Sequence, residues 1–145
     1  TVIAAPQRRL RDIALAPATA FPPPPAASVD IVERITAAMR THAAASAVVD
    51  GASTTTYGEL GRRSAALAAN LQQRGVGPDH KVLIVADRGV GFITGVVATL
   101  RAGAAYVPVK PDLPADRIAW IPSDVAPTTI LCEGPLPASL AHLAD

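Results

Sequence analysis

Lys81-Val82-Leu83-Ile84-Val85-Ala86 is the stretch of the sequence that decides the fold. After one lysine it is apolar at every position, without the alternation of a strand that has one face in water. A short continuous apolar run rich in valine and isoleucine favours a strand buried on both faces, as strands of parallel sheets are. The sequence therefore predicts an α/β fold in which this strand lies inside a parallel sheet.

The segments around this strand alternate between helical and extended patterns. Apolar residues recur at helical spacing before and after it, and two further short apolar runs follow. Gly75 and Gly103 stand where two of the helices should end. The expected helices are 28–43, 57–74, 91–102 and 114–123, the expected strands are 81–86, 104–109 and 128–132, and a small hairpin is expected at 47–56.

Some of these boundaries carry signals of their own. Ser28 is a good N-cap for helix 28–43. Pro122 should weaken the end of helix 114–123, because a proline inside a helix removes a hydrogen bond. If the sheet is a fragment of a larger one, its last strand, 128–132, is an unprotected edge.

The N-terminal part of the chain has a different character. Residues 16–27 include four consecutive prolines, from Pro22 to Pro25. These favour extended polyproline II structure and predict a semi-rigid linker. Residues 7–15 fit a short helix or an adhering strap. The chain therefore divides into an interdomain linker at 1–27 and a folded region at 28–145.

Composition excludes several classes of protein. The chain has 145 residues, a formal net charge of +1 and 3% aromatic residues, which does not fit a dedicated nucleic-acid-binding protein. One cysteine excludes a disulfide framework and a multi-cysteine zinc site. Every apolar stretch is shorter than the roughly 18 residues of a membrane span. We expect a cytoplasmic protein with neither membrane nor nucleic-acid partners, and the missing initiator methionine suggests that the chain was cut from a longer one.

A glycine-rich segment follows the decisive strand and opens the next helix, where a dinucleotide-binding loop would lie. In Gly89-Val90-Gly91-Phe92-Ile93-Thr94-Gly95, three residues separate the last two glycines, whereas the dinucleotide-binding fingerprint has two. We favour the other interpretation, in which small residues let this helix pack closely on the sheet.

The remaining candidates for chemistry are scattered. His42, His80 and His142 have neither ligand spacing nor a cysteine neighbour, so we expect surface or capping histidines and no metal site. Cys132 lies in an apolar strand without a basic neighbour, which predicts an inert buried thiol. The acidic residues of the C-terminal third, Asp112, Asp116 and Asp124, have no spacing that would pair them.

Two segments carry more information than the rest. Thr56-Tyr57-Gly58-Glu59-Leu60 is a helix start with capping-box spacing, in which Thr56 is the cap and Glu59 follows three residues later. Leu100-Arg101-Ala102-Gly103-Ala104-Ala105-Tyr106-Val107-Pro108-Val109 ends a helix, turns on Gly103 and enters a strand. The ring of Tyr106 should be half buried, with its hydroxyl near a partner.

These two segments resemble the first and second core motifs of the adenylation domains of nonribosomal peptide synthetases, in the acyl-adenylate-forming ligase superfamily. The segment Arg74 to Pro78 and the proline-flanked helix start at Pro114 also match the family's pattern, and the resemblance covers roughly residues 28–133. The residues that carry the two motifs are Thr56, Tyr57, Glu59, Leu60, Leu100, Ala102, Gly103, Ala105, Tyr106 and Pro108.

The resemblance implies a partial parallel-sheet layer from the N-terminal domain of such a ligase. A complete parent uses ATP and Mg²⁺ to activate an amino or aryl acid as acyl-AMP, and passes the acyl group to the phosphopantetheine thiol of a carrier protein. The family's phosphate loop, acid pocket, ribose-binding aspartate and catalytic lysine all lie downstream of the matched part. The ten motif residues therefore carry over as structural positions only, with no catalytic, cofactor-binding or metal-binding residue, and the chain alone is not expected to be an enzyme.

The sequence departs from the family's pattern at several places. Lys110 stands where the family usually has aspartate, and Leu113 where an aromatic residue is frequent. The loop after Asp87-Arg88 is glycine-rich, and Pro122 interrupts a helix. Together these departures raise the possibility of a degenerate adenylation remnant.

Three hypotheses therefore remain open. The chain is a piece of a working adenylation domain; or it is a truncated, non-catalytic remnant that serves as a structural or docking module; or it is a small nucleotide-binding α/β protein. The first two imply neighbouring synthetase domains as partners: a condensation-type domain, a carrier protein and the rest of the adenylation domain.

Overall fold

The computed structural model describes residues 30–143. The expected short helix at 7–15, the linker at 16–27 and the cap at Ser28 lie outside the described residues. The elements in chain order are α1 (Ile31–Thr41), β1 (Ser46–Asp50), β2 (Ser53–Thr56), α2 (Tyr57–Gln73), β3 (Lys81–Val85), α3 (Val90–Arg101), β4 (Ala105–Val109), α4 (Ala115–Val125), β5 (Thr129–Cys132) and the 3₁₀-helix η3 (Ala138–Leu143).

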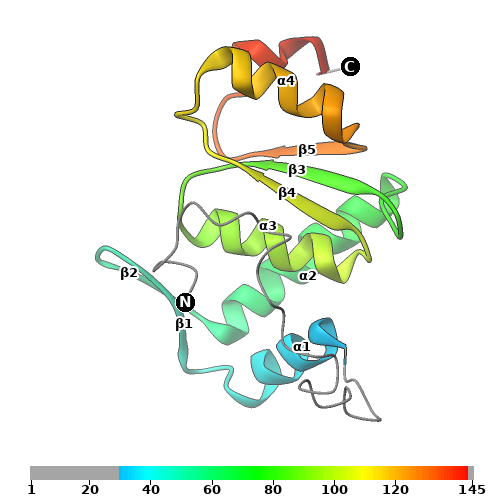
Figure 1. Ribbon diagram of the computed structural model, residues 1–145. Coiled ribbons are helices and arrows are strands. Elements are labelled where there is room, and N and C mark those ends of the chain that lie inside the picture. The colour runs from blue at the N-terminus through cyan, green and yellow to red at the C-terminus, as the bar shows by residue number, and fades with distance from the viewer. Residues whose placement is uncertain (1–29, 144–145) are drawn as a thin grey trace, which may run out of the picture.

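A three-stranded parallel sheet forms the centre of the fold, in the order β4-β3-β5 (Figure 1). Val82 of β3 lies opposite Tyr106 of β4 on one side and Thr129 of β5 on the other. The predicted α/β class with a parallel sheet is confirmed.

Strand β3 is buried on both faces. Val82 and Leu83 are fully shielded from solvent, and Val85 is 2% exposed. Val82 and Ile84 belong to one hydrophobic cluster, whereas Leu83 and Val85 belong to another, because successive side chains of a strand point to opposite faces. The continuous apolar run is therefore explained by a separate core on each side of the sheet.

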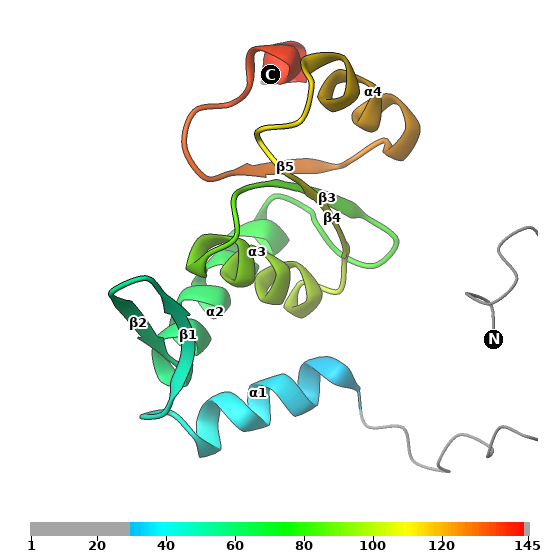
Figure 2. The ribbon, with the colours of Figure 1, turned by 60° about the vertical axis from the view of Figure 1, so that its left-hand side comes forward.

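Helices cover both faces of the sheet (Figures 1 and 2). Helices α2 and α3 lie on one face, where Leu71 and Ala98 pack with Val82 and Ile84. Helix α4 and η3 lie on the other face, where Ile118 and Leu140 pack against β3. The 3₁₀-helix η3 was not anticipated from the sequence.

Helix α1 and the antiparallel β1–β2 hairpin form a smaller unit beside α2 and α3. Its core contains Met39 of α1, Leu60 of α2 and Val97 of α3. The cap of α1 differs from the expected one: Asp30 lies at the N-cap, and its carboxylate accepts a hydrogen bond from the Val32 amide at 3.0 Å. Both serine and aspartate satisfy a helix N-terminus, so composition alone could not choose between them.

Two helices end in the same hydrogen-bonded turn. After α3, the Gly103 amide donates to the Leu100 carbonyl at 3.0 Å, and the Ala104 amide donates to the Thr99 carbonyl at 3.1 Å. Gly75 ends α2 in the same way. Gly103 has φ +86° and Gly75 has φ +82°, and residues other than glycine rarely adopt such positive values. Both glycines therefore stop their helices as the sequence predicted.

Tyr106 is 40% exposed, so its ring on the outer strand β4 is about half buried, as the sequence predicted. One helix boundary differs from the expectation. Helix α4 continues past Pro122 to Val125 and ends at Ala126, which has φ +49°. Within residues 30–143, no helix is long and apolar enough to cross a membrane.

The turn after α3 provides a first test. Gly103→Ala should lower the free energy of unfolding by about 1–2 kcal/mol, because alanine is strained at this positive φ. Gly77→Ala is the matched control, since its backbone has no positive φ and a methyl group there meets nothing within 4 Å. Equal stability of the two variants in urea unfolding would contradict the assignment of the turn.

Thr99 provides a second test. Its side chain is fully buried, and its hydroxyl has no hydrogen-bond partner in the described part of the chain. A buried donor without a partner costs about 1–3 kcal/mol, so Thr99→Val, which keeps the shape, should raise the melting temperature. Thr94→Val is the control and should lower it, because the Thr94 hydroxyl donates to the Val90 carbonyl at 2.6 Å.

Candidate functional site

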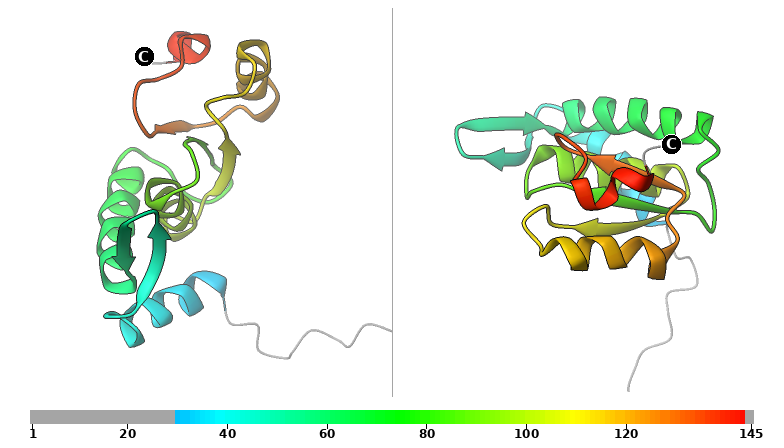
Figure 3. Two further views of the ribbon diagram at one scale, coloured as in Figure 1. Left: turned by 90° about the vertical axis from the view of Figure 1, so that its left-hand side faces the viewer. Right: turned by 90° about the horizontal axis from the view of Figure 1, so that it is seen from above.

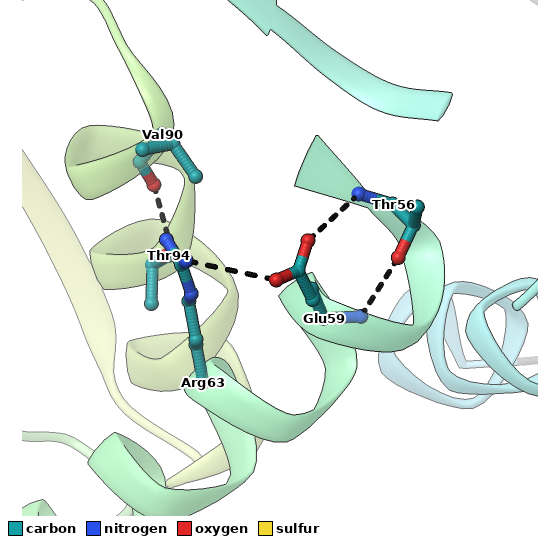
Figure 4. Close-up of polar contacts among 5 residues, drawn as sticks. All are labelled: Thr56, Glu59, Arg63, Val90 and Thr94. Atoms are coloured by element: carbon teal, nitrogen blue, oxygen red, sulfur yellow. Dashed lines mark hydrogen bonds and ion pairs between the residues drawn. The ribbon is translucent and has the colours of Figure 1, made fainter. Parts of the chain in front are cut away.

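The first motif segment forms the start of α2, and its polar contacts are local. The Thr56 hydroxyl accepts a hydrogen bond from the Glu59 amide at 3.2 Å, and the Glu59 carboxylate accepts one from the Thr56 amide at 3.4 Å (Figure 4). This reciprocal capping box satisfies two amides that the helix itself leaves free. The second carboxylate oxygen of Glu59 lies 3.9 Å from the Arg63 guanidinium, one helical turn further on.

The same segment also joins α2 to the turn after α1. The Tyr57 amide donates to the Ala45 carbonyl at 3.0 Å, and the Gly58 amide donates to the Ala43 carbonyl at 2.9 Å. A Cβ atom at Gly58 would lie 3.0 Å from the Ala43 oxygen, so the approach is close. Leu60, 4% exposed, then enters the core between α1 and α3. These contacts position the helices relative to one another.

The second motif segment joins α3 to β4 and is also structural. Ala102 is 4% exposed and lies in the core beside Leu71 of α2. The Ala105 amide donates to the His80 carbonyl at 2.9 Å, which starts the pairing of β4 with β3. Leu60 and Ala102 belong to different clusters, so the two motif segments do not meet in one site.

A hollow of about 270 Å³ lies outside the carboxyl ends of β3 and β4. Such hollows are ligand sites in open α/β sheets when the connections from two neighbouring strands leave on opposite faces. Here α3 follows β3 on one face and α4 follows β4 on the other (Figure 2). The side chains at this end include Arg88, Phe92 and Lys110, and of the motif residues only Pro108 contributes to the lining.

The charge of this hollow is partly neutralised. The Lys110 ammonium donates a hydrogen bond to the Asp112 carboxylate at 2.9 Å, and this contact lowers the pKa of Asp112. Both side chains are more than half exposed, so solvent screens the pair. Only Arg88 remains as a cation there without an ion-pair partner within the described residues.

A second hollow lies between α2, α3 and β5. It has a volume of about 380 Å³, and its polar side chains are Arg63, Thr94 and Glu133. The Glu133 carboxylate lies directly against Gly91 near the start of α3, where a Cβ atom would clash with it. The sequence alone does not single out these three side chains, because each resembles an ordinary surface residue of its own element.

The glycine-rich segment is a packing feature. Gly95 lies on the sheet side of α3, where a Cβ atom would be 3.4 Å from the Ile84 side chain and 3.7 Å from that of Leu131. The absence of a side chain therefore lets α3 approach β3 and β5 closely, which confirms this interpretation of the segment.

His80 and Cys132 have structural surroundings. Nδ1 of His80 accepts a hydrogen bond from the Gly77 amide at 3.1 Å and closes the turn before β3. Within residues 30–143, no group of three histidine, cysteine, aspartate or glutamate side chains is placed to hold a metal ion. Cys132 is half buried in β5, and burial raises the pKa of its thiol.

Comparison with known proteins decides the family. The family described as AMP-binding enzyme matches residues 35–145. The chain belongs to this family. It is 43% identical over 84 residues to tyrocidine synthase 3 of Brevibacillus parabrevis, and 36% identical over 99 residues to bacitracin synthase 1 of Bacillus licheniformis. These stretches are 58% and 68% of the present chain but only 1% and 2% of the two synthases.

Solved structures of other proteins share the fold of this chain. The nonribosomal peptide synthetase FmoA3, in a form bound to α-methyl-L-serine-AMP, superposes with a TM-score of 0.73 at 29% identity. The match covers 83% of this chain and 13% of that one. A benzoate CoA ligase from Burkholderia xenovorans LB400 shares the fold with a TM-score of 0.67 at 23% identity. The chain thus corresponds to the N-terminal part of an adenylation domain of the synthetase type.

The described residues of this chain do not fit ATP with Mg²⁺. Phosphoryl chemistry needs convergent phosphate-binding groups and oxygen ligands for the metal. The hollow at the strand ends has Arg88 and Lys110 but no carboxylate in its lining, and the hollow beside β5 has a single carboxylate, Glu133. No step of an adenylation reaction can be assigned to these side chains.

The thiol provides a third test. Because burial raises the pKa of Cys132, less thiolate is present at a given pH than in a free cysteine. The folded chain should react several-fold more slowly with a disulfide reagent at about pH 7.5 than the chain unfolded in urea, and the rate should still be rising above about pH 9. Equal rates for the folded and unfolded chain would contradict the burial of the thiol.

Proposed function

We propose that this chain is the first α/β layer of a synthetase adenylation domain and acts as its scaffold. The observation that carries the proposal is that a well-packed sheet-and-helix unit matches a solved synthetase over 83% of this chain but over only 13% of that protein. In this proposal residues 28–145 form the N-terminal part of the domain and residues 1–27 form the linker that precedes it. The ten motif residues then hold helices and strands in place.

The reaction of the complete domain is a proposal for the longer protein. There the carboxylate of an amino or aryl acid attacks the α-phosphate of ATP, with Mg²⁺ bound, and pyrophosphate leaves. The thiol of a carrier protein then attacks the carbonyl carbon of the acyl-adenylate, so that a thioester forms and AMP leaves. The chain alone is proposed to be inactive, since its described side chains form no convergent phosphate or metal site.

The proposed partners are the neighbouring parts of a synthetase. A condensation-type domain would precede the proline-rich segment, and the rest of the adenylation domain and a carrier protein would follow. The relatives are multidomain synthetases, which supports this arrangement. We also propose that the protein is cytoplasmic.

A second candidate function is that of a docking module kept after loss of catalysis. A docking module needs an exposed apolar surface, and three separate elements of this structure each present a large apolar side chain to solvent. Trp120 on α4 is 62% exposed, Val49 of the hairpin 69%, and Ile31 at the start of α1 57%.

A graft distinguishes the two candidates. Residues 35–145 of this chain replace the matching stretch in an adenylation domain of tyrocidine synthase 3, and ATP–pyrophosphate exchange is measured with the amino acid that this host domain activates. A scaffold should support exchange within about tenfold of the unmodified host, because the phosphate and acid sites come from the host. The unmodified host domain and the host with the stretch deleted are the controls.

Two results would contradict the proposal. A soluble, folded graft without exchange activity would favour the docking module. Exchange by the isolated chain above the background of a buffer control would show that it contains a catalytic site of its own.

A further inference from the structure

The outer face of α4 carries an exposed tryptophan between two carboxylates. Trp120 is 62% exposed, and Asp116 and Asp124 are exposed as well. Because residues four apart lie on the same side of a helix, these three side chains form one stripe. Ile118 and Pro122 of the same helix are buried, so the stripe faces away from the sheet. We call it the α4 stripe.

The carboxylates of the α4 stripe have no cation of their own in the described structure. Within residues 30–143, the ion pairs lie on α2 and in the segment between β4 and α4, and none includes Asp116 or Asp124. Arg117 lies beside the stripe, but it is the single cation of the helix against two carboxylates. The stripe therefore combines a net negative charge with an exposed aromatic ring.

This combination of groups fits arginine side chains. A guanidinium is attracted to the face of a tryptophan ring, and it pairs with a carboxylate through two parallel hydrogen bonds. Arginine is favoured over lysine, because an ammonium lacks this planar fork. The other aromatic side chain with substantial exposure among the described residues, Tyr106, lies on β4, which contains no acidic residue. The α4 stripe is thus the described surface best suited to bind a guanidinium.

The N-terminal segment of the same chain supplies the matching charge. The side chains of residues 1–29 carry a net charge of +2, from Arg8, Arg9 and Arg11 against a single carboxylate, Asp12. No other window of four residues in the sequence contains three arginines. In an extended chain alternate residues share one side, and in a helix residues three apart do so. Two arginines of this cluster therefore share one side in either conformation.

The spacing of these arginines matches that of the α4 stripe. Four residues of a helix rise by about 6 Å, which separates Trp120 from each carboxylate along the axis of α4. Alternate residues of an extended chain are about 6.6 Å apart, and residues three apart in a helix are about 4.5 Å apart along its axis. One arginine can therefore lie over the Trp120 ring while the next one pairs with Asp116 or Asp124.

The chain between the cluster and α1 is long enough for this contact. Helices α1 and α4 lie at opposite ends of the molecule (Figures 1 and 3). A compact unit of about 115 residues is roughly 35 Å across, and a path over half its surface is about 55 Å. Arg11 and Asp30 are 19 positions apart in the sequence, and a chain of that length reaches about 60 Å when extended. The four consecutive prolines at 22–25 favour such an extended path.

We propose that the arginine cluster at residues 8–11 binds the α4 stripe of the same molecule and so holds the N-terminal segment against α4. The inference goes beyond the scaffold function and does not rest on it. Because one chain joins the two surfaces, the contact forms at a high effective concentration, whereas a second copy must be recruited from solution. In a longer protein, the contact brings the part that precedes residue 8 to the α4 end of this unit, away from α1.

The single tryptophan of the chain reports this contact directly. The test measures quenching of Trp120 fluorescence by acrylamide, a neutral quencher, in the full chain. A variant that combines Arg8→Gln, Arg9→Gln and Arg11→Gln should be quenched at least about twofold more strongly, because the ring loses its cover. In the unchanged chain, about 0.5 M NaCl should also increase the quenching, since salt screens the charge pairs.

A second triple variant controls for the change in net charge. Arg34→Gln, Arg40→Gln and Arg62→Gln remove three exposed arginines from α1 and α2, which lie away from α4 (Figure 1). Quenching of Trp120 in this variant should equal that of the unchanged chain, and circular dichroism checks that both variants fold. Equal quenching of the unchanged chain and the two triple variants would overturn the inference, and so would an equal increase in both variants.

Trypsin, which cuts after arginine, tests the contact from its other side. Trp120→Ala should speed cleavage at residues 8–11 at least about fivefold, because arginines released from the stripe are open to the protease. Val49→Ala is the matched control, since Val49 is 69% exposed on the β1–β2 hairpin, and its cleavage rate should equal that of the unchanged chain. Equal cleavage rates in the Trp120→Ala and Val49→Ala variants would count against the contact.

Protein concentration distinguishes the source of the arginines. A contact within one molecule gives the same quenching and the same cleavage rate at every protein concentration. Protection of Trp120 that grows with concentration, together with a dimer in sedimentation, would overturn the inference in favour of a second copy. Adenylation enters none of these measurements, so failure of the contact leaves the scaffold function standing, and an inactive graft leaves the contact standing.

Discussion

The burial of β3 from both sides is the constraint on which the rest of the structure depends. Val82 and Leu83 point in opposite directions and are both fully shielded, so each face of the sheet needs its own helical cover. That requirement places α2 and α3 on one face and α4 with η3 on the other. The close contact of Gly95 with Ile84 follows as well, because a helix must approach the strand closely to exclude water from it.

Much of this fold could be predicted because its signals are local. The capping box of Thr56 and Glu59 spans three residues, and Gly103 ends a helix through its own backbone conformation. The order of the strands is a different matter. Tyr106 could be expected to be about half buried, but its place on an outer strand depends on which strands lie beside β4, and strand order is a property of the whole sheet.

The candidate site likewise depends on contacts between distant parts of the chain, which local sequence signals do not predict. That the last strand is an edge can be expected from the sequence, whereas the hollow between α2, α3 and β5 cannot. Arg63 and Leu67 lie on one face of α2 and resemble an ordinary amphipathic surface. They line a hollow because β5, which begins only at Thr129, lies beside them. The family could be inferred from two short motifs because each motif forms a local turn, and such turns accept few residue types.

The order of the strands has a consequence for synthesis on the ribosome. Strand β3 lies between β4 and β5, but the chain reaches β4 first, and β5 about twice as far from β3 in sequence. A growing chain can therefore pair β3 with β4 while the other edge of β3 is still unoccupied. During that interval one edge of the apolar strand β3 is unpaired, and a chaperone can bind the nascent chain there.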